Sequence, residues 1–494
     1  MGVNRRGFFK GAAAYWFTIG VQSWVGRSVS AADSRFIRHG AHTPEGKKNL
    51  LIYAKGVSAM MNTQKYPDGD PRSWLFQWYT HMVRSDRTKA SELSRVYKQN
   101  DPFRDVAIAM WNTCQSHMGQ NENYFLPWHR MYVLAFEEII RVTTGDESFS
   151  LPYWDYTDPA HRAMPGEFRQ KNDPIWGALF RSARKPKVNE GEDIDKLPGA
   201  SAITLNALKS PIYGESPVDV GFCQNIDNDP HGAIHVNVGN NLGMGRVPWA
   251  AGDPIFWLHH CNIDRLWASW AKAGGRSPKD LSGVFTFANR DGSPIQLDVS
   301  NFMDTKNYEY DKYVKRPDGS IDFDRQGLGD SAISATSRLG AGAVVLKSSP
   351  TQVRLAPEQG GVLGDVAGVS FGSRVKKLAP GRAIYLRFDS VSAKSDPGAS
   401  FDVYLTLKSQ TNGDRSDAGF IGTLNFFNAT HGPHKHGGHL QPRMARNYSF
   451  ILDDRAKDLL KNVDVENPSV LLIPNNAVAA GASPTIGKIS LIAY

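Results

Sequence analysis

Cysteine is scarce in this chain, with three residues, Cys114, Cys223 and Cys261, among 494. Three cysteines build no disulfide framework, so the protein must be stabilised by packing and bound groups. Long apolar runs are also missing: the longest is short and lies near the N-terminus, so we expect no membrane span after processing. With 41% hydrophobic residues, the chain can bury two or three cores.

The net charge of +8 does not indicate a nucleic-acid partner. Half of it comes from Arg5, Arg6, Lys10 and Arg27, which lie in a segment without acidic residues. The rest of the chain is nearly balanced and has no basic run, which is typical of an ordinary solvated surface. We therefore expect no nucleic-acid partner.

Residues 1–31 have the layout of an export signal. Paired arginines at 5 and 6 precede a mildly apolar stretch over 11–26, and small residues follow at 28–32. This order predicts a signal peptide, and the paired arginines resemble the twin-arginine type, which carries folded proteins. We expect a protein exported to the periplasm or secreted; a buried N-terminal helix is the alternative.

The remaining chain has two regions with different residue patterns. Apolar residues at three- and four-residue spacing predict helices over 131–141 and 254–271, in a mainly helical region interrupted by a loop-rich stretch at 144–230. After about residue 330, short β-rich runs separated by Gly, Pro, Asn and Asp predict a β-sandwich or barrel. The expected strands are 343–347, 384–388, 401–407, 420–427, 448–452, 470–473 and 486–492.

The fold class that follows is α+β and multidomain. We expect a mainly α catalytic domain followed by a C-terminal β-sandwich domain. The predicted divisions are a signal peptide at 1–31, a catalytic domain at 32–326, a linker at 327–340 and the C-terminal domain at 341–494.

The 14 histidines are distributed unevenly, and seven of them lie in two aromatic-rich neighbourhoods. His231 and His235 are four apart, which places both imidazoles on one face of a helix where they can share a metal. A glycine follows His231 where a zinc peptidase needs a general-base glutamate, so that class is excluded. Another pair, His259 and His260, lies inside a hydrophobic helix, with Phe256 one turn before His260.

The other neighbourhood repeats this arrangement. Phe125 lies four residues before His129, and His117 and His81 lie upstream. Imidazole coordination suits copper, zinc, iron or nickel. Two sets of three imidazoles without carboxylates favour a metal that cycles through the +1 state and binds oxygen between two centres.

Three segments carry a resemblance to the type 3 copper proteins, which comprise tyrosinases, catechol oxidases and molluscan-type haemocyanins. They are Phe125-Leu-Pro-Trp-His129-Arg130, His231-Gly-Ala-Ile-His235 and Asp253-Pro-Ile-Phe256-Trp-Leu-His259-His260-x-Asn-x-Asp264-Arg265-x-Trp267. The resemblance implies a four-helix bundle that holds two copper ions. It implies one copper on His81, His117 and His129, a second on His231, His235 and His260, and His259, Phe125, Phe256 and Asp264 around these ligands.

The resemblance also assigns roles to residues near the ligands. Asp227 stands where the family has an acid that assists phenol deprotonation, so it is a candidate catalytic residue. Gly232 stands where strong monophenolases often have asparagine, which weakens the case for a tyrosinase. Some members join a cysteine to the second histidine by a thioether, so Cys114 is either crosslinked to His117 or a buried, inert thiol.

The C-terminal half resembles plant polyphenol oxidases more weakly. Phe401-Asp-Val-Tyr-Leu405 is similar to the start of a strand in their C-terminal domain, and Tyr308-Glu-Tyr310 is similar to the motif that ends their catalytic domain. This implies a β-sandwich that shields the copper site until it is removed or displaced. His431, His434, His436 and His439 are interpreted either as an exposed loop or as a copper-handling segment.

The implied reaction is the oxidation of phenolic small molecules, with dioxygen as co-substrate. Monophenols would be hydroxylated at the ortho position and o-diphenols oxidised to o-quinones. The alternatives are a catechol oxidase without monophenolase activity, a haemocyanin-type oxygen carrier, and a zinc-loaded or non-catalytic binding protein. The sequence does not indicate an oligomeric state.

Overall fold

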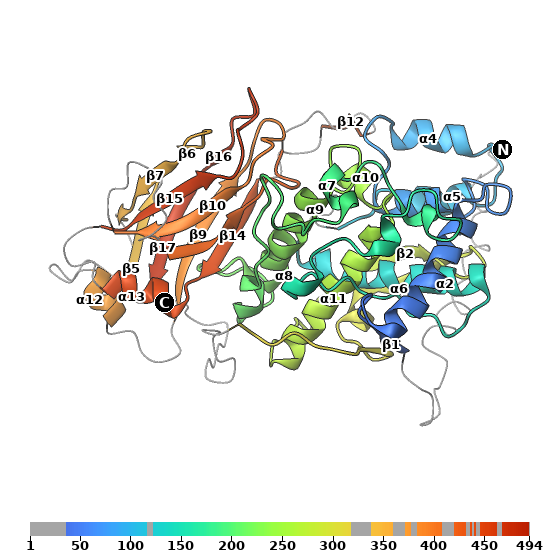
Figure 1. Cartoon of the computed structure of the whole chain (residues 1–494), viewed down its shortest axis with the longest axis horizontal. Helices are drawn as coiled ribbons and strands as arrows, with labels where there is room; N and C mark the ends of the chain where they lie inside the picture. The colour runs from blue at the N-terminus through green and yellow to red at the C-terminus, as the bar shows by residue number, and fades with distance from the viewer. Residues whose placement is uncertain are drawn as a thin grey trace, which may run out of the picture.

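A helical half and a strand-rich half lie side by side in the computed structural model (Figure 1). The predicted order of helices first and strands afterwards is confirmed. The signal peptide predicted at 1–31 lies outside the described residues, as does most of the predicted linker, so the domain boundaries stay predictions. The described residues are 36–115, 122–317, 337–358, 371–376, 383–407, 419–430, 435–436, 439–440, 445–461 and 467–493.

Two long helices form the centre of the helical half. Helix α6, Phe125–Thr144, contains the predicted helix over 131–141, and α11, Ile255–Lys272, matches the one predicted over 254–271. They pack through the stacked rings of Phe136 and Trp257, whose centroids are 3.5 Å apart. Helix α6 ends at Gly145, which has a φ of +75° that glycine adopts without strain.

A third long helix, α2 (Pro44–Met61), packs on the other side of α6. Gly56 makes this contact close, because a Cβ there would meet the Ile140 side chain at 2.7 Å. None of the described helices is both long and apolar enough to cross a membrane. The shorter helices of this half are α3 (Trp74–His81), α4 (Lys89–Val96), α5 (Arg104–Met110), α7 (Pro186–Glu190) and α10 (Val247–Ala250).

The segment that carries His231 and His235 is not one regular helix. Helix α8, Gly221–Ile226, runs into a π-helical turn at Asp227–Gly232, and α9, Ala233–Val238, follows. Asp229 has an extended backbone (φ −150°, ψ 124°) and Pro230 follows it, so the helical hydrogen bonds are interrupted. The interruption precedes His231, and Gly232 and Ala233 have helical backbone angles, so both histidines lie one turn apart on the same helical segment, as the spacing predicts.

Two antiparallel sheets make up the strand-rich half. One has the order β11-β10-β15-β7 and the other β14-β9-β17-β5-β8. Side chains from both sheets, among them Leu386, Phe401 and Leu472, belong to one hydrophobic core. The strands are β5 (Ser337–Ala341), β7 (Thr351–Arg354), β8 (Ala356–Pro357), β9 (Ile384–Val391), β10 (Phe401–Thr406), β11 (Gly419–Leu424), β14 (Arg446–Ile451), β15 (Ser469–Pro474) and β17 (Lys488–Ala493).

All seven predicted runs contain a strand. The run at 343–347 holds the short β6 (Val344–Val345), which pairs with β16 (Thr485–Ile486). Two short helices, α12 (Phe371–Lys376) and α13 (Asp454–Lys461), accompany the sheets. The helical half has two small strand pairs of its own, parallel β1 (Phe36–Arg38) with β4 (Tyr308–Tyr310) and antiparallel β2 (Val284–Ala288) with β3 (Pro294–Asp298).

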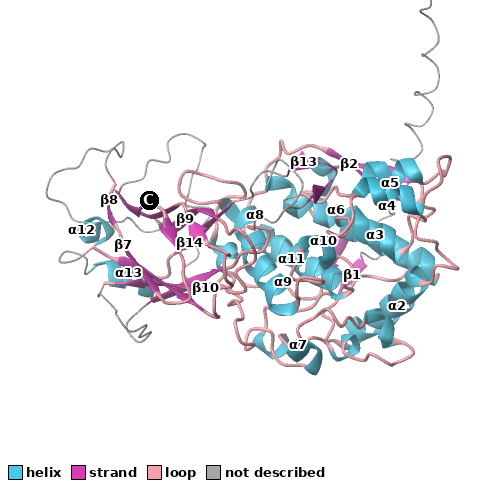
Figure 2. Cartoon of the chain, turned by 90° about the horizontal axis from the view of Figure 1, so that it is seen from above, coloured by secondary structure: helices cyan, strands magenta, loops and turns pink. Residues whose placement is uncertain are grey.

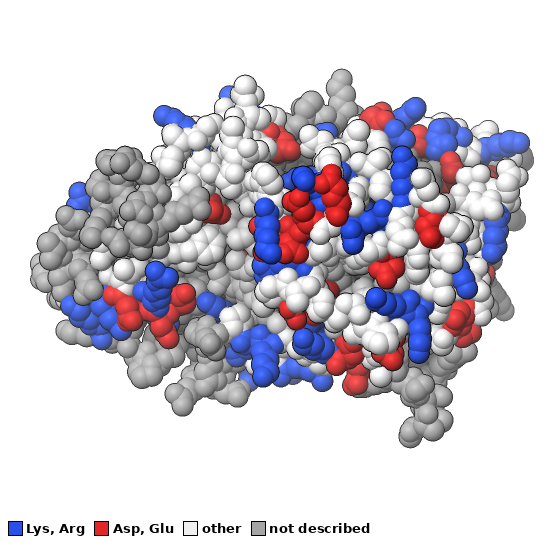
Figure 3. Space-filling model, viewed as in Figure 1, with Lys and Arg blue, Asp and Glu red and all other residues white. Residues whose placement is uncertain are grey.

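The two halves meet where α8 lies against β14, as the view from above shows (Figure 2). Val218 packs there with Tyr385, Ile451 and Ile492 of the second sheet. On the face drawn in Figure 3, basic and acidic side chains are interspersed over the helical half. The site described next lies inside the helical half, beside this junction.

Candidate metal centre and its family

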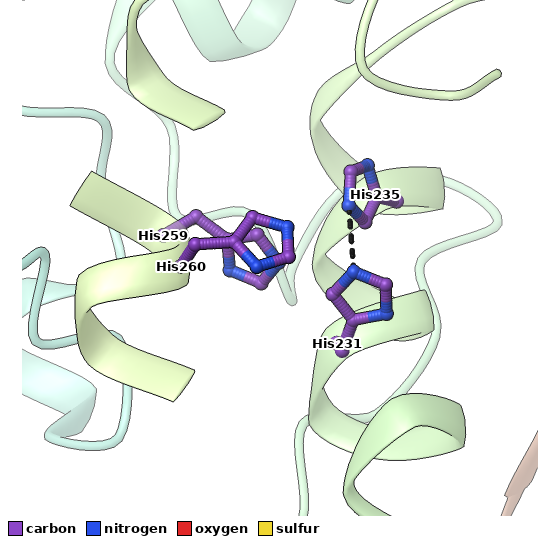
Figure 4. A group of neighbouring side chains, drawn as sticks. All are labelled: His231, His235, His259 and His260. Atoms are coloured by element: carbon purple, nitrogen blue, oxygen red, sulfur yellow. Dashed lines mark hydrogen bonds between the residues drawn. The ribbon is translucent and has the colours of Figure 1, made fainter. Parts of the chain in front are cut away.

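Four histidines, His231, His235, His259 and His260, form what we call the second cluster. All four are buried, and one potential ligand atom from each lies within 4.8 Å of those of the others. Figure 4 shows two of the rings reaching into a common space from the π-turn and α9, and the other two from α11.

Backbone carbonyls fix the orientation of two of these rings. The Nδ1–H of His231 donates to the carbonyl oxygen of Asp227 at 3.1 Å, and that of His235 donates to Met244 at 2.7 Å. Because a carbonyl oxygen only accepts, each ring carries a proton on Nδ1 and turns its Nε2 atom toward the cluster. The two Nε2 atoms lie 3.1 Å apart (Figure 4), a spacing that suits two ligands of one ion.

The two histidines of α11 complete the second cluster. Nε2 of His259 and both ring nitrogens of His260 have no hydrogen-bond partner among the described residues, although both side chains are buried. Nδ1 of His259 lies 2.9 Å from the Tyr156 hydroxyl. Burial lowers the pKa of both imidazoles well below the usual value, so they are neutral at physiological pH, the form that binds metal.

The first cluster consists of His81, Cys114 and His129, which are also buried and have donor atoms within 4.8 Å of one another. The Nδ1–H of His129 donates to the Phe125 carbonyl at 2.7 Å, which leaves Nε2 facing the cluster. Burial lowers the pKa of His129 to about 3. His117, the third expected ligand, lies outside the described residues.

The two clusters adjoin each other across α6 and α11. The rings of His129 and His260 are stacked with centroids 4.3 Å apart and planes 11° apart. The ring centroid of Phe125 is 4.8 Å from the centroids of both His129 and His231, and the centroid of Phe256 is 4.2 Å from that of His260. Five of the six expected ligands are thus brought together. His259, which was expected to surround the ligands, has a ring nitrogen within the second cluster itself.

The donor set fits a pair of transition-metal ions. Buried imidazoles whose ring nitrogens converge suit copper, zinc, iron or nickel, and the thiol in the first cluster favours softer ions such as Cu(I). The ring nitrogens of His259 and His260 that lack a hydrogen-bond partner among the described residues also indicate a metal site. A buried polar atom without a partner destabilises the fold, and a bound metal ion would supply that partner.

Asp264 lies one turn after His260 and faces away from the clusters into an ionic network. It accepts hydrogen bonds from Arg130 at 2.5 Å and Arg38 at 3.0 Å, and from the hydroxyls of Tyr308 and Tyr310 at 2.6 Å each. Burial disfavours its charge, but the two guanidinium groups outweigh burial and lower the pKa of this carboxyl. Because Arg130 follows His129 in the chain, Asp264 ties the two ligand-bearing helices together.

Two residues of the strand-rich half reach the second cluster, and sequence reasoning missed both. Phe427 stacks on His235, with centroids 4.2 Å apart and planes 9° apart, and meets His231 edge-on. Arg446 of β14 donates to the Asp227 carboxylate at 2.7 Å, and that carboxylate lies 2.9 Å from Nδ1 of His231. The candidate catalytic acid is therefore paired with the C-terminal half.

The other histidines lie elsewhere. His42 and His161 are stacked 3.7 Å apart beside a cavity of about 230 Å³ whose lining includes neither cluster. His39 is 3.3 Å from Asp311. His431 and His434 lie outside the described residues. His436 and His439 are backbone partners in the hairpin β12 (Lys435–His436) and β13 (His439–Leu440), and their side chains are not described.

Comparisons with known proteins agree with this centre. Residues 71–187 and 165–273 match the model of the common central domain of tyrosinase. A tyrosinase of Hahella sp. (strain CCB-MM4) is 26% identical over 481 residues, which cover 90% of this chain and 96% of that protein. A chloroplastic polyphenol oxidase of Malus domestica is 23% identical, over 85% of this chain and 72% of that protein.

Solved structures share the fold over nearly the whole chain. A latent aurone synthase superposes with a TM-score of 0.60 at 19% identity, covering 94% of this chain and 91% of that one. A latent apple tyrosinase gives 0.59 at 20% identity, covering 94% and 98%. The resemblance inferred from the motifs is confirmed: the tyrosinase model matches the segments that carry both histidine clusters, and the chain is similar to oxidoreductases of the tyrosinase and polyphenol oxidase kind over most of its length.

Proposed function

We propose that this protein oxidises phenols with dioxygen at a dicopper centre. His81, His117 and His129 would hold one copper, and His231, His235 and His260 the other, inside a four-helix bundle. The observation that carries the proposal is the contact between the two clusters, in which the stacked rings of His129 and His260 bring two sets of buried imidazoles together. Bound copper would supply the electron transfer and oxygen activation.

The overall chemistry balances without a further reductant. Two o-diphenols give two o-quinones while one dioxygen takes up four electrons and four protons and becomes two waters. A monophenol and one dioxygen give one o-quinone and one water, with one oxygen atom entering the ring. Both hydroxylation and o-diphenol oxidation belong to the proposal, and a catechol oxidase lacking the first is the closest alternative.

The protein's own residues would position the ring and move the first proton. The His235 face is flat and now covered by Phe427 in parallel stacking, which is the contact a phenol ring would make. The Asp227 carboxylate lies beside this position and is the candidate to assist phenol deprotonation once Arg446 has moved away.

We further propose that the strand-rich half, as a β-sandwich, keeps the enzyme latent. Its Phe427 occupies the stacking position on His235, and its Arg446 neutralises Asp227. Asn425 also donates to the Asn228 carbonyl at 2.9 Å beside the second cluster. Displacement or removal of this half would open the centre to substrate.

The location of the protein is also a proposal. The paired arginines and the small-residue end of residues 1–31 support export by the twin-arginine route, to the periplasm or the outside. Folding before export would allow copper to be inserted beforehand.

Oxygen consumption on copper-loaded protein tests the function. Turnover with both a monophenol and an o-diphenol supports the full proposal, and turnover with the o-diphenol alone supports a catechol oxidase. Reversible oxygen binding without turnover would indicate a carrier. A protein that binds zinc but no copper and consumes no oxygen would contradict the proposal.

Asp227→Ala tests the role of the acid. Losing the carboxylate should lower monophenol turnover more than o-diphenol turnover, because the monophenol needs the additional proton-transfer step. Equal losses with both substrates would remove Asp227 from that role. Copper content measured on the same samples separates a chemical effect from a loss of metal.

A further inference from the structure

Tyr156 links the second cluster to a neighbouring tryptophan. Its hydroxyl donates to Nδ1 of His259 at 2.9 Å, and its ring centroid is 5.5 Å from that of His259. The ring of Trp154 meets Tyr156 edge-on, with centroids 5.4 Å apart. His259 is itself stacked on His231, with centroids 5.2 Å apart and planes 12° apart. A chain of ring contacts therefore runs from an expected copper ligand through His259 and Tyr156 to Trp154.

The far end of this chain lies at the cavity of about 230 Å³ beside the stacked rings of His42 and His161. Trp154 lies in the wall of the cavity, and its Nε1–H donates to the His161 carbonyl at 2.9 Å. Lys47, also in the wall, is exposed, and the lining residues all belong to the helical half. The cavity therefore lies at the protein surface, in a place that the strand-rich half does not line.

A hydrogen-bonded base is what a buried tyrosine needs in order to give up an electron. Removing an electron from a phenol makes its hydroxyl a strong acid, so the proton must leave at the same time. Nδ1 of His259 already accepts the hydrogen bond from Tyr156, and an imidazole nitrogen can take up the proton. Because Tyr156 is fully buried, this base stands where water would stand for an exposed tyrosine.

A comparable pair of rings beside the first cluster lacks both features. The ring centroid of Trp128 is 4.9 Å from those of His129 and Tyr132, and both aromatic residues are fully buried. The Tyr132 hydroxyl, however, donates to the backbone carbonyl of Gln77, which accepts a hydrogen bond but does not take up the proton. Neither Trp128 nor Tyr132 lines the cavity. Aromatic packing is thus common to both pairs, whereas the base and the cavity distinguish Tyr156.

We propose that Trp154 and Tyr156 carry electrons from the cavity to the centre, so that a small reductant in the cavity is oxidised without entering the covered site. This path rests on the proposed function, because dioxygen at the centre is the oxidant. It matters most in the latent form, in which Phe427 occupies the stacking position on His235. Oxidising power at a centre without a phenol would otherwise fall on the ligand histidines.

The electrons balance for a reductant that gives up one electron and one proton at a time, such as ascorbate. Four ascorbates supply four electrons and four protons, and one dioxygen takes them up to become two waters. Two of the electrons are used while dioxygen is reduced, and two return the copper to Cu(I). At each passage Tyr156 loses an electron and its proton moves to His259. Trp154 then returns an electron to Tyr156, the proton moves back, and ascorbate restores Trp154.

Electron paramagnetic resonance tests the path without turnover. Full-length, copper-loaded protein is reduced, mixed with dioxygen in the absence of phenol and ascorbate, and frozen at increasing times. We expect a radical on Tyr156 or Trp154 in the wild type, its loss in Tyr156→Phe, and an unchanged signal in Tyr132→Phe, the matched control. In Trp154→Phe the radical should stay on Tyr156 and should no longer be quenched by added ascorbate. A radical that survives Tyr156→Phe would overturn the proposal.

Oxygen uptake with ascorbate tests the cavity separately. Ala160 is exposed and lines the cavity, so Ala160→Trp should fill it while leaving the ring contacts in place. We expect this variant to keep the radical but to lose ascorbate-dependent uptake, which Tyr132→Phe should retain. Uptake that Ala160→Trp leaves unchanged would overturn the proposal. Phenol turnover without any radical would overturn the path alone, whereas protein that binds no copper and consumes no oxygen would overturn both the path and the proposed function.

Discussion

Replacing Phe427 by alanine should activate the intact protein. The side chain is 6% exposed, and its ring covers the face of His235. Burial of a phenylalanine contributes about 2–3 kcal/mol and the aromatic stack about 1 kcal/mol. Losing about 3–4 kcal/mol would shift the equilibrium from the covered to the open form by about 100- to 1,000-fold.

The assay is the initial rate of oxygen uptake with an o-diphenol, measured on intact, copper-saturated protein. If the covered form limits the rate, Phe427→Ala should raise kcat by up to about 100-fold before the open form dominates. Phe420→Ala is the matched control, because Phe420 lies on β11, is 41% exposed and packs on Tyr404. Equal rates for wild type, Phe420→Ala and Phe427→Ala at equal copper content would refute the idea that this ring covers the site.

Three further predictions concern the ion pair of the covering half, the buried network around Asp264 and the bound copper. Arg446→Gln should also raise o-diphenol turnover, because it removes the ion pair with Asp227; unchanged turnover would mean that this pair does not hold the halves together. Asp264→Asn should lower the free energy of unfolding in urea by about 3–5 kcal/mol, since it leaves Arg130 and Arg38 buried without their shared carboxylate. The pKa of Asp264 is lowered, so its stabilisation is present above the ordinary value of 3.8 and is lost as the pH falls through the folded-state value; the gap between wild type and variant should close only in strong acid. Chelation of copper should abolish oxygen uptake and lower the thermal midpoint, and added copper should restore both; a midpoint independent of copper would contradict the proposed ligands.

Local periodicity accounts for what the sequence predicted well. The helices around His129 and His260 and all seven strand runs were predicted because each depends on residues close together in the chain. The pairs Phe125–His129 and Phe256–His260 are one helical turn apart, so their contacts also follow from spacing. His231 and His235 are also one helical turn apart, and the interruption at Asp229 and Pro230, which spacing does not predict, lies just before them.

Long-range contacts account for what was missed. Phe427 is an ordinary strand-region phenylalanine in the sequence, and its contact with His235 spans 192 residues. Arg446 meets Asp227 across 219 residues. No spacing rule connects such positions, because the contact is created only when two separately formed halves pack together. His259 was missed for a different reason, because it is next to His260, which was predicted as the ligand. Only the orientation of its ring, which the sequence does not give, places His259 in the same cluster.

Gly232 illustrates how this packing changes the meaning of a single residue. In the sequence, glycine after His231 weakens the case for monophenol hydroxylation, because strong monophenolases of the family often have asparagine there. In the structure, a Cβ at position 232 would lie 2.7 Å from Oδ1 of Asn425, whose Nδ2–H donates to the neighbouring Asn228 carbonyl. A larger side chain would therefore push away the segment that carries Phe427. The fit of the covering half thus gives a second reason for glycine at this position, independent of the choice between monophenol and o-diphenol chemistry, which the oxygen-uptake assay decides.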